Sequence, residues 1–213
     1  MIGIIDYGMG NLYSVSKALE RLDYDYIISN DPKELKKTKG YILPGVGAFG
    51  DAMEELNRQN LASFIKEEAD RGKPLLGICL GMQLLFEQSE ENGISDGLGL
   101  LKGRVIKFKG TTAEGESYKV PHMGWNKLTF NRDSELLTNV EEEHVYFVHS
   151  YYVDTDDKEA IIATADYDVK VPAVVGRDNV FGTQFHPEKS SDIGVKMLRN
   201  FANYVEKRGE RSE

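Results

Sequence analysis

Short apolar runs alternate with amphipathic helical patterns through the first half of the chain. Four of the runs predict strands: Ile2–Ile5, Tyr26–Ile28, Tyr41–Leu43 and Leu75–Ile78. Apolar residues at helical spacing predict one helix capped by Asn11, a second over Phe49–Arg71 and a short third over Gly81–Glu87. Because strands that alternate with helices pair in parallel through crossover connections, this pattern indicates an α/β fold.

The second half has a different pattern, in which short strands follow one another through tight turns. The predicted strands are Arg104–Phe108, Trp125–Phe130, Val145–Val148, Tyr151–Asp154, Ile161–Ala165, Ala173–Gly176 and Phe181–Gln184. A helix over Asp192–Lys207 is predicted to follow them. Neither a repeat nor a low-complexity linker divides the chain. We therefore expect a single domain over residues 1–213, with a mixed, mostly parallel sheet flanked by helices.

Charge and cysteine content exclude several classes of function. The 26 basic and 35 acidic residues give a net charge of −9, which disfavours a broad nucleic-acid-binding surface. No apolar run approaches the roughly 20 residues that span a bilayer, and the N-terminus does not resemble a signal peptide. A single cysteine permits no intramolecular disulfide, and a cytoplasmic location is expected. One cysteine and four scattered histidines do not predict a metal site.

A candidate nucleophile lies in the segment Gly77-Ile78-Cys79-Leu80-Gly81, between a predicted buried strand and a helix. This is the layout of a nucleophile elbow with cysteine in place of serine, where the sharp turn requires glycine on both sides. A thiolate at such a position can act as a nucleophile. The alternative is an inert buried cysteine at a strand end, which is the usual state of a free cysteine.

A candidate base lies in Phe185-His186-Pro187-Glu188, where a predicted strand ends. A cysteine nucleophile needs a base within hydrogen-bonding reach, and the base needs an acceptor that fixes its tautomer. Glu188, held two residues away by Pro187, is suited to orient His186. The alternative is a histidine at a strand end followed by a surface glutamate.

Two glycine-containing segments follow predicted strands. Pro44-Gly45-Val46-Gly47 allows the backbone to approach a ligand and to present amides to a developing negative charge, as in an oxyanion hole. The alternative is an ordinary strand-to-helix turn. Gly8-Met9-Gly10 does not complete a dinucleotide-binding fingerprint, because Tyr13 stands where the third glycine is required. No cofactor is expected.

Taken together, Gly77–Gln83 and Phe185–Glu188 resemble the motifs of the triad-type, class-I glutamine amidotransferases. Further segments resemble those of the glutaminase subunits of imidazole glycerol phosphate synthases: Asp6–Leu12, Pro121–Asn126, Tyr146–Tyr151 and Glu188–Ser191. The resemblance covers nearly the whole chain. It implies a flavodoxin-like class-I amidotransferase fold and hydrolysis of glutamine to glutamate and ammonia by Cys79, His186 and Glu188.

The resemblance also implies roles for other residues. Those of the oxyanion hole are Val46, Gly47 and Leu80. Those of the glutamine pocket are Gly47, Gln83, His149, Ser150 and Tyr151. Those of a partner interface are Asn11, Trp125, Tyr146 and Lys189. We interpret two further histidines, His122 and His144, as structural or solvated.

The implied partner is a (β/α)₈-barrel cyclase that forms a 1:1 heterodimer with the chain and receives ammonia through an internal channel. The cyclase makes imidazole glycerol phosphate and aminoimidazole carboxamide ribotide in histidine biosynthesis. The isolated chain is expected to be nearly inactive, with the Pro44–Gly47 loop turned away from the oxyanion site until ligand binds the cyclase.

Three other functions remain open on the sequence. A sister amidotransferase for pyridoxal phosphate, anthranilate or GMP synthesis would share the triad but not the segments specific to the synthase subunit. A cysteine hydrolase on a similar scaffold would have no need for both the Pro44–Gly47 loop and Gln83. A non-enzymatic, flavodoxin-like binding domain would leave Cys79 inert.

Overall fold

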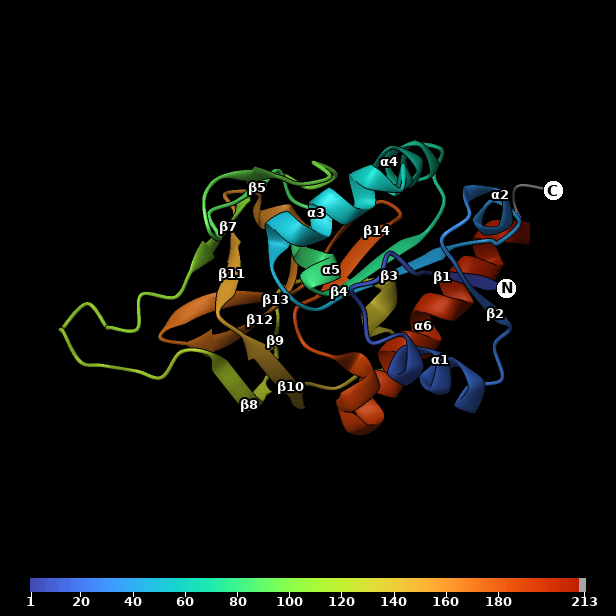
Figure 1. Cartoon of the computed structure of the whole chain (residues 1–213). Helices are drawn as coiled ribbons and strands as arrows, with labels where there is room; N and C mark the ends of the chain where they lie inside the picture. Colours follow the sequence, from blue (N-terminus) through green and yellow to red (C-terminus); the bar gives the residue numbers. More distant parts are fainter. Residues whose placement is uncertain (211–213) are drawn as a thin grey trace.

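The computed structural model describes residues 1–210, and an eight-stranded mixed sheet runs through it (Figure 1). The strand order is β2-β1-β3-β4-β14-β13-β12-β9. Strands β2 to β14 of this order are parallel, and the remaining three continue antiparallel. The bounds are β1 Ile2–Ile5, β2 Tyr26–Ser29, β3 Tyr41–Gly45, β4 Leu75–Cys79, β9 Thr129–Phe130, β12 Ile161–Tyr167, β13 Val169–Arg177 and β14 Val180–Thr183.

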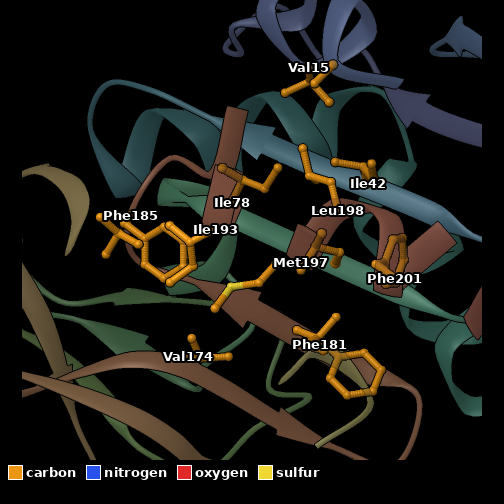
Figure 2. Packing of buried hydrophobic residues seen from close by; sticks show 14 of the residues in the cluster. Val15, Ile42, Ile78, Val174, Phe181, Phe185, Ile193, Met197, Leu198 and Phe201 are labelled. Carbon is orange, nitrogen blue, oxygen red and sulfur yellow. The ribbon is translucent and has the colours of Figure 1, made fainter. Parts of the chain in front are cut away.

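Helices cover both faces of the parallel strands, as the alternating pattern predicted. On one face lie α1 (Leu12–Arg21) and α6 (Ser191–Glu210), and on the other α3 (Phe49–Arg58) and α4 (Leu61–Asp70) (Figure 1). A one-turn helix, α2 (Pro32–Leu35), follows β2. Each face buries its own apolar cluster, since neighbouring strand residues point to opposite sides of the sheet. Figure 2 shows part of the first cluster, where Ile42 and Ile78 pack near Leu198 and Phe201 of α6.

Two helix predictions differ from the structure. The helix predicted over Phe49–Arg71 is two helices, because Asn60 between them has a left-handed backbone with φ of 58°. The helix predicted over Gly81–Glu87 is a single turn, α5 (Leu80–Gln83). After this turn the chain enters short strands, β5 (Gln88–Ser89) and β6 (Ser95–Asp96), which lack a recognisable apolar alternation.

Strands of the second half also form two smaller sheets that the pattern did not separate. One pairs β8 (His122–Lys127) with β10 (His144–His149) in antiparallel register. The other has the order β11-β7-β5-β6, where β7 is Arg104–Lys107 and β11 is Tyr151–Asp154. The strand predicted over Trp125–Phe130 is therefore divided between β8 and β9, which belong to different sheets.

Three short 3₁₀ helices complete the described elements: η1 (Glu135–Leu137), η2 (Lys158–Ala160) and η3 (Pro187–Lys189). The long helix α6 extends the predicted Asp192–Lys207 segment at both ends. Among residues 1–210, none of the helices has both the length and the apolar character needed to cross a membrane.

Candidate active site

At the centre of the sheet the chain turns at Cys79, the last residue of β4. Its backbone is strained, with φ of 56° and ψ of −112°, and α5 begins at the next residue. A Cβ at Gly77 would lie 2.5 Å from the carbonyl oxygen of Gly81, and a Cβ at Gly81 would lie 1.8 Å from that of Leu43. Only glycine fits at either position, so the structure confirms the elbow geometry predicted from the sequence.

The carboxyl ends of three parallel strands bring the candidate residues together. Cys79 is opposite Gly45 of β3, and Thr183 of β14 is opposite the residue before Cys79. The Val46–Gly47 loop therefore leaves β3 on one side of Cys79, and the segment leading to His186 leaves β14 on the other. Ligands of open α/β sheets bind at this end of the strands.

His186 and Glu188 form a buried pair beside Cys79. The Nδ1 atom of His186 lies 2.9 Å from Oε1 of Glu188, and the two side chains are 4% and 1% exposed. Burial alone would lower the pKa of His186, but hydrogen bonds to Cys79 and Glu188 outweigh it and raise the pKa to about 9. With Nδ1 directed at the carboxylate, Nε2 is the nitrogen that faces the thiol. The structure thus brings the three predicted catalytic residues together.

The backbone of His186 is held by strand β10 and by Ser190. The N–H of His186 donates to the carbonyl of Tyr146 at 3.2 Å, and the Ser190 hydroxyl donates to the carbonyl of His186 at 2.6 Å. The same hydroxyl accepts from the N–H of Tyr146 at 3.0 Å. Ser190 is fully buried, so these bonds are shielded from water. Tyr146, predicted at a partner interface, therefore also positions the candidate base.

A pocket of about 440 Å³ opens over Cys79. Its lining includes every residue predicted for the oxyanion hole and the glutamine pocket: Val46, Gly47, Leu80, Gln83, His149, Ser150 and Tyr151. Cys79 and His186 also line it, together with Pro121, Val148 and Glu91. A larger hollow of about 800 Å³ lies elsewhere, among charged side chains such as Arg104 and Asp157, but its lining includes neither a cysteine nor a histidine. We therefore take the pocket over Cys79 as the candidate active site.

The amides predicted for the oxyanion hole are in different states. The N–H of Leu80 is the first of helix α5 and has no acceptor within its own helix. The N–H of Val46, in contrast, donates to the carbonyl of Met9 at 3.0 Å and so is turned to another acceptor. Gly47 has a φ of 103°, a left-handed backbone conformation that glycine adopts without the steric cost of a β-carbon.

Gln83 is fixed by two hydrogen bonds on the pocket wall. Its Nε2 donates to the carbonyl of Tyr151 and to Oε1 of Gln184, at 3.0 Å each. Gln184 in turn directs its Nε2 to the Cys79 sulfur at 3.9 Å. Both N–H groups of Gln83 are thereby used within the protein, and its carbonyl oxygen is left to accept from a ligand.

Glu91 is a pocket residue that the sequence analysis missed. Its Oε2 accepts from the N–H of Phe49 at 2.8 Å and caps helix α3, whose N-cap residue Ala48 has no capping side chain. Its carboxyl group is the only one on the described lining of the pocket. Glu91 is 42 residues from Phe49 in sequence and carries no local motif; the missing cap at Ala48 is the one signal that a distant acceptor was needed.

The residues predicted for a partner interface lie on elements that contact one another in a row. Helix α1 contacts η3, η3 contacts β10, and β10 pairs with β8. Trp125 on β8 is 54% exposed, with its ring 6.1 Å from that of Tyr146, and Lys189 is also exposed. Asn11 caps α1 by accepting from the N–H of Ser14, as predicted, and is half-buried.

The remaining histidines are outside the triad. His122 is buried and His144 is exposed, which fits their interpretation as structural and solvated. Within residues 1–210, no group of three His, Cys, Asp or Glu side chains is arranged to hold a metal ion.

Comparison with known proteins agrees with this geometry. The profile of the family described as glutamine amidotransferase class-I matches residues 3–204. The structure of PurLQS from Thermotoga maritima superposes with a TM-score of 0.73 at 24% identity, covering 96% of this chain and 98% of that one. The chain therefore belongs to the class-I glutamine amidotransferase family and has its fold.

Two curated relatives define a narrower group. "Imidazole glycerol phosphate synthase subunit HisH" of Geobacillus sp. (strain WCH70) is 67% identical over 98% of this chain and 99% of its own length. The protein of the same name from Bacillus subtilis (strain 168) is 59% identical over 94% and 95%. Within the class-I amidotransferases, the chain thus belongs to the family of these synthase subunits.

Proposed function

We propose that the chain is the glutaminase subunit of an imidazole glycerol phosphate synthase and releases ammonia from glutamine at Cys79. The observation that carries the proposal is the contact of Cys79 with His186 in the lining of the pocket, with the other ring nitrogen of His186 bonded to the buried Glu188. The alternative of an inert cysteine does not explain why a buried histidine–carboxylate pair faces the thiol. A single amidotransferase domain over the whole chain belongs to this proposal, and the family match over residues 3–204 supports it.

The reaction proceeds in two steps. The sulfur of Cys79 attacks the side-chain amide carbon of glutamine, and His186 gives its proton to the leaving nitrogen, so that ammonia departs and a thioester forms. Because the pKa of His186 is about 9, the ring carries this proton at neutral pH. Water then attacks the thioester while His186 takes its proton, which releases glutamate and restores the starting pair of Cys79 thiolate and protonated His186. Glu188 holds the imidazole in one tautomer throughout.

The oxyanion of each tetrahedral intermediate is placed near the N–H of Leu80. The second donor of the Val46–Gly47 loop is the N–H of Val46, which belongs to the Gly45–Val46 peptide. Its bond to the carbonyl of Met9 must break, because that N–H now points away from the site. We propose that the loop changes orientation when the partner binds its ligand. The isolated protein is then nearly inactive, and activation consists of a rotation of the Gly45–Val46 peptide.

Glu91 is proposed to bind the α-ammonium group of glutamine, since it supplies the carboxyl group of the pocket lining. Replacing Glu91 by Gln keeps an acceptor for the N–H of Phe49 but removes the charge. We expect KM for glutamine to rise about 10- to 100-fold, with a smaller change in kcat, because hydrogen bonds to charged groups contribute more than neutral ones.

The matched control for this variant is Glu90→Gln. Glu90 is the exposed neighbour and pairs with Arg104 outside the pocket, so its replacement changes the net charge equally. Steady-state kinetics of glutamate release measure both variants. An unchanged KM in Glu91→Gln would exclude Glu91 from substrate binding.

The proposed partner is a (β/α)₈-barrel cyclase in a 1:1 heterodimer that takes up the ammonia through a channel. The names of the relatives, which are subunits, support a partner, and the exposed Trp125 and Lys189 beside Tyr146 and Asn11 support the position of its docking surface. A cytoplasmic location is proposed with it.

Glutamate release by the chain, alone and with the cyclase and its nucleotide ligand, tests the function. We expect release to increase strongly in the ligand-bound complex. Equal rates in the two conditions would contradict the proposed activation. A folded chain whose Cys79 is alkylated by a glutamine analogue, but which no cyclase activates, would point to an amidotransferase of another pathway.

A further inference from the structure

Two buried histidines outside the triad are joined side chain to side chain. Nδ1 of His122 lies 2.9 Å from Nε2 of His149, and the residues are 3% and 7% exposed. They are opposite each other on the paired strands β8 and β10. His149 is part of the pocket wall, whereas the reaction proposed above makes no use of His122.

The donor and acceptor of the bond between the two rings follow from the other hydrogen bond of His149. Nδ1 of His149 lies 2.7 Å from the carbonyl oxygen of Tyr151, which can only accept, so Nδ1 carries the hydrogen. Nε2 of a neutral His149 is then an acceptor, and Nδ1 of His122 must donate to it. Each ring thus has its hydrogen on Nδ1.

Asn126 continues the chain on the other side. Its Nδ2 lies 3.2 Å from Nε2 of His122 and donates to the carbonyl of Asp166 at 2.8 Å. Its Oδ1 accepts from the N–H of Lys127 at 2.8 Å, which fixes the orientation of the amide. Asn126 therefore donates to His122, and the bonds run in one direction from Asn126 to Tyr151.

Both histidine rings are neutral, and the ring of His122 is also held by stacking. Burial lowers the pKa of His122 to about 4 and that of His149 to about 3, against the smaller opposing effect of the Tyr151 carbonyl on His149. A proton on either ring would set two N–H groups against each other. The ring of His122 is stacked between Phe147 and Tyr167, with centroids at 4.5 and 3.9 Å and planes inclined by 20° in both cases.

We propose that His122 and Asn126 are positioning residues of the glutamine pocket, which hold the Tyr151 carbonyl through a directed chain of hydrogen bonds. That carbonyl is also the acceptor for Gln83, whose other bond leads through Gln184 to the Cys79 sulfur. This series of hydrogen bonds thus connects strand β8 with the nucleophile. This inference rests on the proposed glutaminase function and adds two residues to it.

Alternation along β8 gives the inference a further consequence. His122 and Asn126 lie on the inner face of the strand, while Met123 and Trp125 lie on the outer face and are 58% and 54% exposed. Strand β8, which carries the proposed docking residue Trp125, therefore also carries the first two residues of the hydrogen-bond series. A shift of β8 on docking would be transmitted to the pocket wall.

Kinetics of the complex with the cyclase and its nucleotide ligand test the proposal with three variants. His122→Phe keeps the stacked ring but leaves Nε2 of His149 without a donor, so we expect KM for glutamine to rise about tenfold and kcat to change less. In His122→Asn the side-chain amide can take the place of Nδ1–H and is expected to restore most of the loss. Tyr167→Phe keeps the stack, removes only the hydroxyl bond to Lys119, and should match the wild type.

The tautomers provide a test that does not depend on activity. Nitrogen-15 NMR of the full chain at neutral pH is expected to show the hydrogen of both His122 and His149 on Nδ1. In Asn126→Asp, which keeps the shape but cannot donate, the hydrogen of His122 should move to Nε2 and KM should rise as in His122→Phe. This variant also serves if His122→Phe does not fold.

The outcomes separate the two proposals. A wild-type complex without glutaminase activity would overturn the proposed function. The NMR result would then test only the direction of the hydrogen bonds. An active wild type, with an unchanged KM in folded His122→Phe or Asn126→Asp, would overturn the positioning role. Nε2 tautomers in the wild type would overturn the direction of the chain.

Discussion

Replacing Cys79 by Ala is expected to lower glutamate release by roughly 10⁴- to 10⁶-fold. The chain has a single cysteine, so no other thiol can form the thioester. The pocket and the oxyanion donors remain in this variant, but they cannot replace a covalent step. The measurement is glutamate formation by the complex with its cyclase under saturating glutamine.

The variant needs a control for folding, because Cys79 is part of the strained elbow. Alanine is small enough for the site, and the backbone strain at φ of 56° is the same for both residues. The circular dichroism spectrum, thermal unfolding and cyclase binding should therefore match the wild type closely. Retention of more than a small fraction of the wild-type rate by a cysteine-free chain would refute the assignment of the nucleophile.

Replacing Glu188 by Gln is expected to lower kcat by roughly 10²- to 10⁴-fold, because the charged, acceptor-only carboxylate that fixes the tautomer of the imidazole becomes a neutral amide that can also donate. The same change should lower the pKa of His186. In the wild type, the ring keeps its proton until the pH passes about 9, with hydrogen bonds to Cys79 and Glu188 overcoming burial. Without the carboxylate, burial has less opposition, and the ring loses its proton at a lower pH.

NMR titration of the His186 ring measures this shift, and the pH profile of kcat measures its effect. Asp192→Asn is the matched control, since Asp192 is an exposed carboxylate at the start of α6 and its loss changes the net charge equally. If Glu188→Gln and Asp192→Asn titrate alike at His186, the hydrogen bond at 2.9 Å has no role in setting its pKa.

The parts of the site that the residues predict without the family resemblance are those defined by neighbours along the chain. The elbow needs Gly77, Cys79 and Gly81 at fixed spacing, and the base and its acceptor are two residues apart. Such spacing can be recognised along the chain, although the contact that requires glycine at position 81 is with the carbonyl of Leu43 on the neighbouring strand. The alternation of strands and helices was equally local, and it predicted the parallel strands whose carboxyl ends carry these segments.

The parts that could not be predicted depend on contacts between distant segments. Glu91 reaches the pocket by capping a helix 42 residues earlier, and His122 meets His149 only through the pairing of β8 with β10. Tertiary structure decides these features, and local propensity does not reveal them.

The hydrogen bonds that join Ser190, Tyr146 and His186 limit how this protein can evolve. A strand at a binding surface normally accepts substitutions that follow changes in its partner. Here the same peptide groups of β10 hold the backbone of the candidate base. A backbone adjustment that suits a new partner would also displace the imidazole, so changes of partner must be made through side chains that leave the course of this strand intact.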